Sequence, residues 1–517
     1  MNLAALLDRH AARSPDRVAL IADVGPEHRR VTFRELHAMA VAVSNQLSAD
    51  GLRPGDRVLV LEPMSIELYA ILLGLFRAGM VAMFVDPGAR AQTREACFVE
   101  FAPRAFVGRS VAHLLRLVSP GLRRCARSYS TDRATPFTAR LSFSPGGTAA
   151  CPPEDVVDDH PALLTFTSGT TGLPKATLRT HGLLLAQHRA LEAALKLRAG
   201  EVELTALPIF VLANLASAMT TVLPDANLRK IASFDPAPVI SQINRHRPSR
   251  AIASPAFFEN LLAANAPAPS RIFTGGAPIF PDFVDRWINA NPDSEVVAVY
   301  GSTEAEPVAH VPPDGWTPAV RARIATGGGL PAGQLVAEVR LGILRDQWGT
   351  PVGPFSAQEF NSQLQPRGII GEIVVAGAHV IPGYVGGRGD LETKFDVDGV
   401  RWHRTGDAGY VDDDGSLWLA GRCAARLPGN PCVYPLQVEA AARLHPWVRQ
   451  AACVEINSIR ILAVTPRGRV PEGGIDGLLQ ALEWAGIARV VVRRRLPVDR
   501  RHQAKIDYPR LRAELKR

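Results

Sequence analysis

The chain has 517 residues, of which 47% are hydrophobic and 21% are charged. This length allows two to four domains, and the composition is that of a folded globular protein and excludes intrinsic disorder. The formal net charge is +8, with arginines gathered at 493–495 and 500–501. We attribute these arginines to a solvated face or to the lining of an anionic cofactor site, and expect no nucleic-acid partner because no aromatic residues are interleaved with them.

The spacing of the cysteines and the lengths of the apolar stretches indicate in which part of the cell the protein is found. Six cysteines are scattered without a CxxC pair, which argues against a zinc site or a disulfide framework and suits a reducing cytosol. Charged residues occur within the first ten positions, where a secretory signal would need an apolar core. The apolar stretch 66–85 is interrupted by Glu67 and Arg77. We therefore expect a cytoplasmic protein with no transmembrane segment.

Strands and helices alternate along the first 90 residues. Thr32 and Glu35 have the spacing of a capping box, which predicts that a helix begins there. Strands are predicted over 18–22, 58–61 and 80–85, with further helices from Leu3 and over 64–78. This alternation is typical of parallel sheets covered by helices. Residues 118–160 are rich in Pro, Gly, Ser, Thr and Arg, and we expect a surface loop there.

A strand and a hydroxyl-rich loop follow. Residues 163–167 read LLTFT, the pattern of a buried strand. The next residues are Ser168, Gly169, Thr170, Thr171 and Gly172, with Pro174 and Lys175 close behind. Such a loop can present several N–H groups and hydroxyls to one phosphate, and a lysine can add a positive charge. It is not a Walker A loop, because Lys175 lies three residues after Gly172. An ordinary polar turn is the alternative.

The middle of the chain contains two candidate walls of a ligand pocket. A helix is predicted over 182–198, and the apolar stretch 207–229 could line an acyl pocket or belong to the core. A strand over 271–274 leads into the small residues Gly275, Gly276, Ala277 and Pro278. A turn of small residues lets a flat ligand approach the backbone.

A second motif reads VVAVYGSTEAEPV over 296–308. We expect a strand ending at Tyr300, with Gly301, Ser302, Thr303 and Glu304 beyond its carboxyl end, where α/β sheets bind ligands. Mg²⁺ prefers hard oxygen ligands and bridges phosphate oxygens, so Glu304 is a candidate metal ligand. A surface carboxylate is the alternative for this residue.

The last third carries two more motifs. Residues 371–385 are strand-rich, and 401–422 read RWHRTGDAGYVDDDGSLWLAGR. Asp407 in the TGD turn is suited to accept two ribose hydroxyls, because a carboxylate has two acceptor oxygens. The final 90 or so residues are predicted to form a small α/β unit, in which Lys505 is either a site residue or a solvated lysine.

These motifs, in this order, closely resemble the adenylate-forming superfamily of acyl-CoA synthetases, luciferases and peptide-synthetase adenylation domains. The resemblance covers nearly the whole chain. It implies an α/β fold with a large N-terminal domain (1–421) of stacked α/β sheets plus a β-rich subdomain. A small, mobile α/β C-terminal domain (422–517) would carry the adenylation lysine.

The resemblance also implies roles for individual residues. Thr167, Glu304, Arg422 and Lys505 would be catalytic, with Glu304 holding Mg²⁺ and Arg422 reaching the ribose or phosphate. ATP would contact Thr167, Ser168, Gly169, Thr170, Thr171, Gly172, Lys175, Gly275, Gly276, Ala277, Pro278, Tyr300, Gly301, Ser302, Thr303, Asp407 and Arg422. The expected reaction is AMP-forming activation of a carboxylic acid, which needs positioning and charge neutralisation rather than a protein nucleophile.

Three departures from the common pattern concern the acyl acceptor. Ala424 and Ala425 stand where many thioester-forming members carry Lys-Asp, Val211 stands in a frequent histidine position, and LPGNPCVYP (427–435) replaces a glycine-rich stretch. The strings around 166–182, 213–225 and 254–262 are similar to the branch that contains olefin-pathway β-lactone synthetases. That branch implies a 2-alkyl-3-hydroxy fatty acid whose own hydroxyl closes a β-lactone. The alternatives are a ligase that uses CoA or an acyl-carrier protein, and an inactive nucleotide-binding member.

Overall fold

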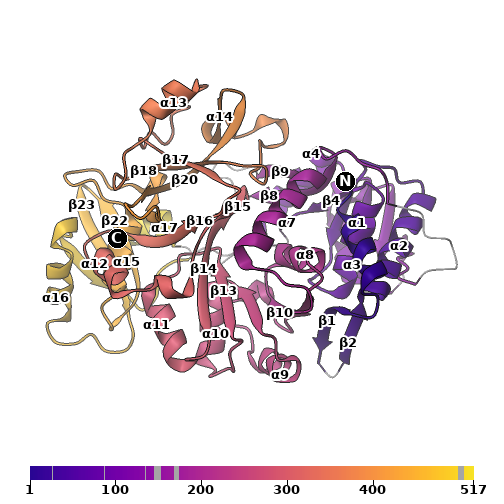
Figure 1. Ribbon diagram of the computed structural model, residues 1–517, viewed down its shortest axis with the longest axis horizontal. Helices are drawn as coiled ribbons and strands as arrows, with labels where there is room; N and C mark the ends of the chain where they lie inside the picture. The colour runs from indigo at the N-terminus through magenta and orange to yellow at the C-terminus, as the bar shows by residue number, and fades with distance from the viewer. Residues whose placement is uncertain are drawn as a thin grey trace. The chain divides into compact units, whose positions relative to one another are not determined.

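The computed structural model describes residues 1–25, 27–86, 88–133, 135–144, 153–167, 174–498 and 506–516. The chain divides into two compact units (Figure 1). Unit 1 comprises Met1–Asp225, Arg245–Ser249 and Gly383–Gly389, and unit 2 comprises Ala226–Asn244, Arg250–Pro382 and Asp390–Arg517. The boundary between residues 421 and 422 is a different division, and it stays a prediction.

Unit 1 is built on a seven-stranded sheet in the order β7-β6-β5-β3-β4-β8-β9. Neighbouring strands from β7 to β8 run parallel, and β9 is antiparallel to β8. The strands are β3 (Arg57–Leu61), β4 (Val81–Phe84), β5 (Ala105–Gly108), β6 (Arg127–Ser130), β7 (Ala139–Arg140), β8 (Pro161–Thr167) and β9 (Lys175–Thr180). The predicted parallel α/β arrangement is confirmed.

A second set of strands in unit 1 has the order β10-β11-β1-β2. They are β1 (Val18–Val24), β2 (Glu27–Thr32), β10 (Val202–Thr205) and β11 (Thr220–Leu223). The helices of the unit are α1 (Ala4–Arg13), α2 (Phe33–Ala49), α3 (Ile66–Arg77), α4 (Ala91–Phe101), α5 (Leu115–Val118), α6 (Pro120–Arg123), α7 (His181–Leu195) and α8 (Pro208–Ala216). Helix α3 is buried along its whole length and packs against α2 and α1, so it forms the centre of the core.

Local sequence signals placed several of these elements correctly. Thr32 caps α2 as predicted, because its hydroxyl accepts from the Glu35 N–H while the Glu35 carboxylate accepts from the Thr32 N–H. Residues 118–160 are predicted to form a surface loop, but the described part of this range contains α6 and the parallel strand β6. Strand β9, which begins at Lys175, has no counterpart among the predicted strands. Strands β6 and β9 are short or polar, so they form because of the strands they pair with and not because of a hydrophobic pattern in their own sequence.

Unit 2 contains a long mixed sheet in the order β17-β18-β20-β21-β16-β15-β14-β13-β12, with β19 paired to β20. Strands β12, β13 and β14 are parallel, and the pairs from β14 onward are antiparallel. The strands are β12 (Arg250–Ala253), β13 (Arg271–Gly275), β14 (Glu295–Ser302), β15 (Ala305–Val311), β16 (Leu330–Leu335), β17 (Arg340–Leu344), β18 (Gly371–Ala376), β19 (Lys394–Val397), β20 (Val400–Val411) and β21 (Leu417–Arg422). The predicted β-rich region is therefore present.

Helices accompany this sheet in its parallel and antiparallel parts. They are α9 (Ala237–His246), α10 (Pro255–Ala263), α11 (Pro281–Ala290), α12 (Pro318–Ala325), α13 (Ala357–Gln363) and α14 (Asp390–Thr393). Phe360 of α13 packs at a 45° tilt against Trp402 of β20, and Phe395 stacks on the same tryptophan in a small aromatic core. This core supports the strand that carries Asp407.

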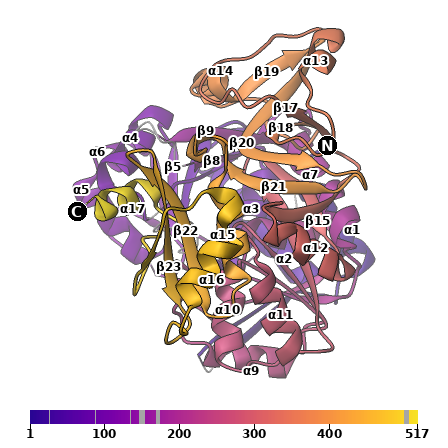
Figure 2. The ribbon, with the colours of Figure 1, turned by 90° about the vertical axis from the view of Figure 1, so that its left-hand side faces the viewer.

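The end of the chain forms the predicted small α/β fold inside unit 2. Its sheet has the order β22-β23-β24, made of β22 (Val448–Ile456), β23 (Ile459–Pro466) and β24 (Arg489–Val492). Helices α15 (Pro435–Arg443), α16 (Gly474–Ala481) and α17 (Tyr508–Leu515) accompany it (Figure 2). Arg443 of α15 pairs with Asp282 of α11, with nitrogen–oxygen distances of 2.9 and 3.0 Å, which ties this fold to the rest of unit 2.

None of the helices in the described ranges combines the length and the apolar character that crossing a bilayer requires. The same part of the chain holds no group of three or more His, Cys, Asp or Glu side chains arranged to bind a metal ion.

The packing of α2 on α3 yields a stability prediction. A Cβ at Gly74 would lie 2.8 Å from Val43 Cβ and 2.9 Å from the Ala40 carbonyl oxygen, so Gly74→Ala should overpack this contact. We expect a loss of about 1–3 kcal/mol and a lower melting temperature by circular dichroism. Gly477→Ala is the control, because a Cβ there meets nothing within 4 Å in α16. An unchanged melting temperature for Gly74→Ala would contradict the helix contact.

Glu439 yields a pH prediction. Burial raises the pKa of Glu439 from 4.5 to about 7, although Tyr508 Oη and the Cys453 N–H donate to its Oε1 at 2.7 and 3.0 Å. Between these pKa values the folded state binds more protons than the unfolded state, so stability should fall as pH rises from 4.5 to 7. Melting curves of Glu439→Gln should lose this dependence, whereas the exposed Glu483→Gln should keep it. Equal slopes in the two variants would refute the assignment.

Candidate active site

In unit 2, the candidate site lies where β13 and β14 end. Gly275 ends β13 and pairs with Val299 of β14, and a Cβ at Gly275 would lie 2.7 Å from the Val299 carbonyl oxygen. Only glycine allows this close approach. The next residues, Gly276, Ala277 and Pro278, leave the strand with Gly276 exposed at φ +80°. The backbone at Gly276, which follows the Gly275–Val299 pair, is therefore accessible to a ligand.

The second motif forms a hairpin rather than a loop beyond a strand end. Strand β14 continues past Tyr300 to Ser302, which pairs with Ala305 of β15, so Thr303 and Glu304 occupy the two-residue tip. The Glu304 N–H donates to Ser302 Oγ at 3.3 Å, and the Glu304 carbonyl accepts from the Ile381 N–H at 2.8 Å. The backbone of Glu304 is thus held on both sides.

Asp407 lies in a strand, which corrects the prediction of a tight turn. Strand β20 runs from Val400 to Val411, and its pairing with β18 skips residues between Arg404 and Ala408. This bulge contains Gly406 at φ +68° and directs Asp407 toward β21, where it pairs with Arg422. The sequence TGD looks like a turn because a bulge and a turn both need a glycine at positive φ.

Asp407 joins Tyr300 and Arg422. Tyr300 Oη donates to Asp407 Oδ2 at 2.8 Å, and Arg422 Nη1 donates to Asp407 Oδ1 at 2.7 Å. Burial and then the nearby Asp407 charge raise the pKa of Tyr300 well above its usual value. The same carboxylate raises the pKa of Arg422, so the guanidinium is positive at any working pH. Two motifs distant in sequence, 296–308 and 401–422, meet at this carboxylate.

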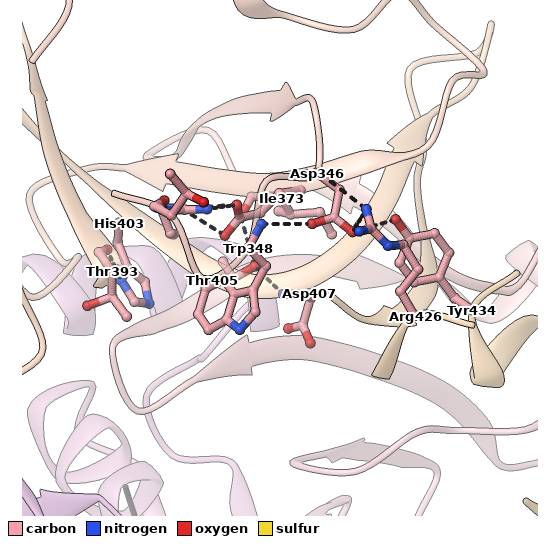
Figure 3. A network of polar contacts seen from close by, with 12 residues as sticks. Asp346, Trp348, Ile373, Thr393, His403, Thr405, Asp407, Arg426 and Tyr434 are labelled. Atoms are coloured by element: carbon pink, nitrogen blue, oxygen red, sulfur yellow. Dashed lines mark hydrogen bonds and ion pairs between the residues drawn. The ribbon is translucent and has the colours of Figure 1, made fainter. Parts of the chain in front are cut away.

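A polar network beneath the bulge fixes Asp407 (Figure 3). Thr405 Oγ1 donates to the Ile373 carbonyl at 2.8 Å and accepts from the Asp407 N–H at 3.0 Å. The neighbouring Arg404 forms an ion pair with Glu372 in which both side chains are 1% exposed. Burial raises the pKa of Glu372, and the Arg404 charge opposes that shift. Removing one partner of such a pair costs about 3–5 kcal/mol, so the bulge has a rigid base.

A second cluster holds the segment that follows Arg422. Tyr434 Oη donates to Asp346 Oδ2 at 2.7 Å, and Arg426 Nη1 lies 3.3 Å from the same oxygen (Figure 3). Cys423 and Ala425 are buried between these contacts. Sequence reasoning missed Asp346, because nothing around a single aspartate in a loop marks its distant partners.

In unit 1, Lys175 begins β9 opposite Thr167 of β8. Its ammonium lies 4.9 Å from the centre of the Tyr384 ring, a cation–π distance, and its aliphatic stem lies against Gly389. The 383–389 segment is fastened to α4 by two Arg388–Glu100 hydrogen bonds of 3.1 and 3.2 Å. The structure therefore supports Lys175 through residues that sequence analysis did not single out.

Several predicted site residues lie outside the described residues. These are Ser168, Gly169, Thr170, Thr171, Gly172 and Lys505. Thr167 is described as the last residue of β8. The roles assigned to all of these residues stay predictions.

The residues present in unit 2 fit a nucleotide. The Asp407 carboxylate is 19% exposed and the Arg422 guanidinium 60% exposed, so a ligand can reach an acceptor for hydroxyls and a donor for phosphate side by side. Glu304 offers one carboxylate at a hairpin tip. This suits Mg²⁺, which commonly takes one or two carboxylates and completes its shell with water and substrate phosphates.

The comparisons define the class. The model of the AMP-binding enzyme family matches residues 7–385, and the chain belongs to this family. It is an AMP-forming ligase that activates an acid with ATP.

Individual relatives align with almost the whole chain. It is 31% identical to an olefin β-lactone synthetase of Xanthomonas campestris over 99% of this chain and 96% of the relative. The olefin β-lactone synthetase of Stenotrophomonas maltophilia is also 31% identical, over 99% and 97%. The ATP-bound structure of MatB from Rhodopseudomonas palustris superposes with a TM-score of 0.80 at 22% identity, over 100% and 99% of the two chains. This likeness confirms the predicted adenylate-forming fold.

The Asp407 contacts yield a prediction. Asp407→Ala removes the predicted acceptor for two ribose hydroxyls, and we expect ATP–pyrophosphate exchange to fall about 100-fold, as two hydrogen bonds to a charged group imply. The melting temperature should fall less, because Arg422 remains solvated and only the Tyr300 hydroxyl loses a buried partner. The control is Asp396→Ala, which breaks an exposed ion pair with Arg401 in the same sheet. Full exchange activity in Asp407→Ala would remove Asp407 from the nucleotide site.

Proposed function

We propose that the chain converts a 2-alkyl-3-hydroxy fatty acid into its acyl-adenylate and then into a β-lactone. In the first step the carboxylate attacks the α-phosphorus of ATP and pyrophosphate leaves. In the second step the 3-hydroxyl oxygen attacks the acyl carbon, the bond from that carbon to AMP breaks, and the hydroxyl proton is released. The supporting observation is the similarity to olefin β-lactone synthetases over 99% of the chain.

Each residue of the site has a role in this proposal. Asp407 accepts the ribose hydroxyls, Tyr300 borders the adenine together with Gly275 to Pro278, and Arg422 reaches the ribose or phosphate. Thr303, Lys175 and residues 167–172 bind the phosphates. Lys505 neutralises charge that builds on the α-phosphate. Mg²⁺ held by Glu304 would neutralise phosphate oxygens when bound.

The segment from Arg422 to Tyr434, which joins β21 to α15 and which we call the hinge, supports an internal acceptor over CoA. Ala424 and Ala425 replace the Lys-Asp pair expected of thioester-forming relatives, and Ala425 is buried at 8% exposure. Arg422 binds Asp407 before these alanines, and Arg426 and Tyr434 bind Asp346 after them, so contacts on both sides hold this segment in place. An internal hydroxyl is already at high effective concentration and needs no channel for a thiol, so such a hinge does not have to turn.

The proposal is tested by substrate pairs. With a 2-alkyl-3-hydroxy fatty acid, we expect AMP and β-lactone in equal amounts, with no increase in rate when CoA is added. The control is the same acid without its 3-hydroxyl, which should exchange pyrophosphate and yield a hydroxamate with hydroxylamine, but form no lactone. Mass spectrometry identifies the products. Faster AMP formation with CoA from a simple fatty acid, accompanied by a thioester, would show an acyl-CoA ligase instead.

A further inference from the structure

A surface of unit 1 exposes large apolar side chains outside the candidate site. The 3₁₀ helix η1 (Ser110–Leu114) continues directly into α5 (Leu115–Val118). Four side chains along this run are 61–79% exposed: Val111, Leu114 and Leu117 at intervals of three residues, and the adjacent Val118. Single exposed apolar residues are ordinary, but four on one short helical face form a patch that has a partner in most proteins.

Phe137 belongs to the same surface. Its side chain is 92% exposed, and its backbone has φ +65°, a region that bulky residues rarely occupy. Arg116 Nη1 donates to the Phe137 carbonyl at 3.2 Å, which attaches the Phe137 loop to α5. The Thr135 N–H and Oγ1 both contact Thr138 Oγ1, at 3.1 and 2.7 Å. The fold therefore holds a phenylalanine in solvent in a strained conformation, with no burial in return.

The sequence around these side chains is strongly basic. Residues 109–140 contain seven arginines and one acidic residue, Asp132, although Arg109 pairs with Glu62 at 3.1 Å. Asp132 accepts hydrogen bonds from Ser110, Ser130 and the Arg133 N–H, which hold the pKa of its carboxyl well below its usual range. Arg123 of α6 donates to the carbonyls of Arg116 and Leu117 in α5, so α6 lies beside α5 (Figure 2).

A basic hollow lies next to α6. It has a volume of about 420 Å³, and its lining includes Arg57, Arg104 and Arg124 together with the apolar side chains of Phe98 and Val99. Asp56 neutralises Arg104 at 3.2 Å, and Arg57 donates to the Phe101 carbonyl at 3.0 Å. Arg124 is exposed at the rim. Guanidinium groups beside an apolar wall suit a phosphate that carries a hydrocarbon part.

We infer that the patch formed by Val111, Leu114, Leu117, Val118 and Phe137 docks on a membrane surface of anionic phospholipid. Aliphatic side chains enter the boundary of the acyl chains, and the surrounding arginines contact lipid phosphates, with the hollow holding a headgroup. An acidic protein would complement the arginines, and a second copy of the chain would cover the leucines but repel through like charge. Anionic phospholipid matches both the apolar side chains, through its acyl chains, and the arginines, through its phosphates. It needs no surface of complementary shape.

The experiment is sedimentation of the full-length protein with vesicles, without ATP or acid, so its outcome is independent of the proposed reaction. We expect binding to vesicles of phosphatidylglycerol mixed with phosphatidylcholine, weakening as salt is raised, and little binding to phosphatidylcholine alone. Equal binding to the two vesicle types, or none to either, would overturn the inference.

Variants assign the binding to this patch. Leu114→Asp with Leu117→Asp should weaken vesicle binding more than tenfold, because two exposed leucines no longer enter the lipid. Arg124→Gln with Arg133→Gln should weaken it about fivefold per arginine. The control is Leu391→Asp, a leucine of α14 with a similar exposure of 69%, which should bind like wild type.

Two further readouts complete the test. All variants should keep the wild-type melting temperature and pyrophosphate exchange, because the substituted side chains are exposed and lie outside the candidate site. Vesicle binding unchanged in the leucine variant would overturn the inference. So would a dimer in sedimentation velocity that this variant dissociates while its vesicle binding persists, because the patch would then be a contact between copies.

Discussion

The Asp407 carboxylate connects the parts of unit 2 that matter for chemistry. It accepts from Tyr300 on β14 and from Arg422 at the end of β21, and its own strand β20 bulges to bring it there. A carboxylate between a phenol and a guanidinium keeps both of its oxygens aligned. Because Arg422 is the last residue before the segment that leads to the small C-terminal fold, the same contact also fixes where that segment begins.

The position of Asp407 is held by the buried contacts between β20 and β18. The Arg404–Glu372 pair is almost completely buried and is surrounded by further hydrogen bonds, including one from Arg404 to the Thr350 carbonyl at 2.6 Å. A buried ion pair adds little net stability, but it tolerates few alternative geometries, because a lost partner leaves an uncompensated charge. Here it lies three residues before Asp407 and restrains the bulge.

The hinge and the acceptor chemistry belong together in our proposal. An enzyme that hands an acyl group to a separate thiol must open a path for it, whereas a hydroxyl on the substrate needs only a closed, dry site. Buried Cys423 and Ala425, with Asp346 bound by Arg426 and Tyr434, are consistent with the second case. If the exposed apolar patch on unit 1 docks on lipid as we infer, it would bring such an enzyme to the place where fatty substrates partition.

The sequence by itself determined the class of fold, the order of most elements and the identity of the motif residues, because strand patterns, capping boxes and glycine-rich turns are local signals. It identified Tyr300, Glu304, Asp407 and Arg422 as candidates, and predicted the α2 cap and the small C-terminal α/β fold. Only the tertiary structure decided that Asp407 lies in a bulge, that Glu304 lies at a hairpin tip, and that β9 begins at Lys175. It alone revealed Glu372, Asp346 and Tyr384 as supports, and the exposed Phe137. These features depend on pairing and burial between residues far apart in the chain, and no local pattern encodes such partners.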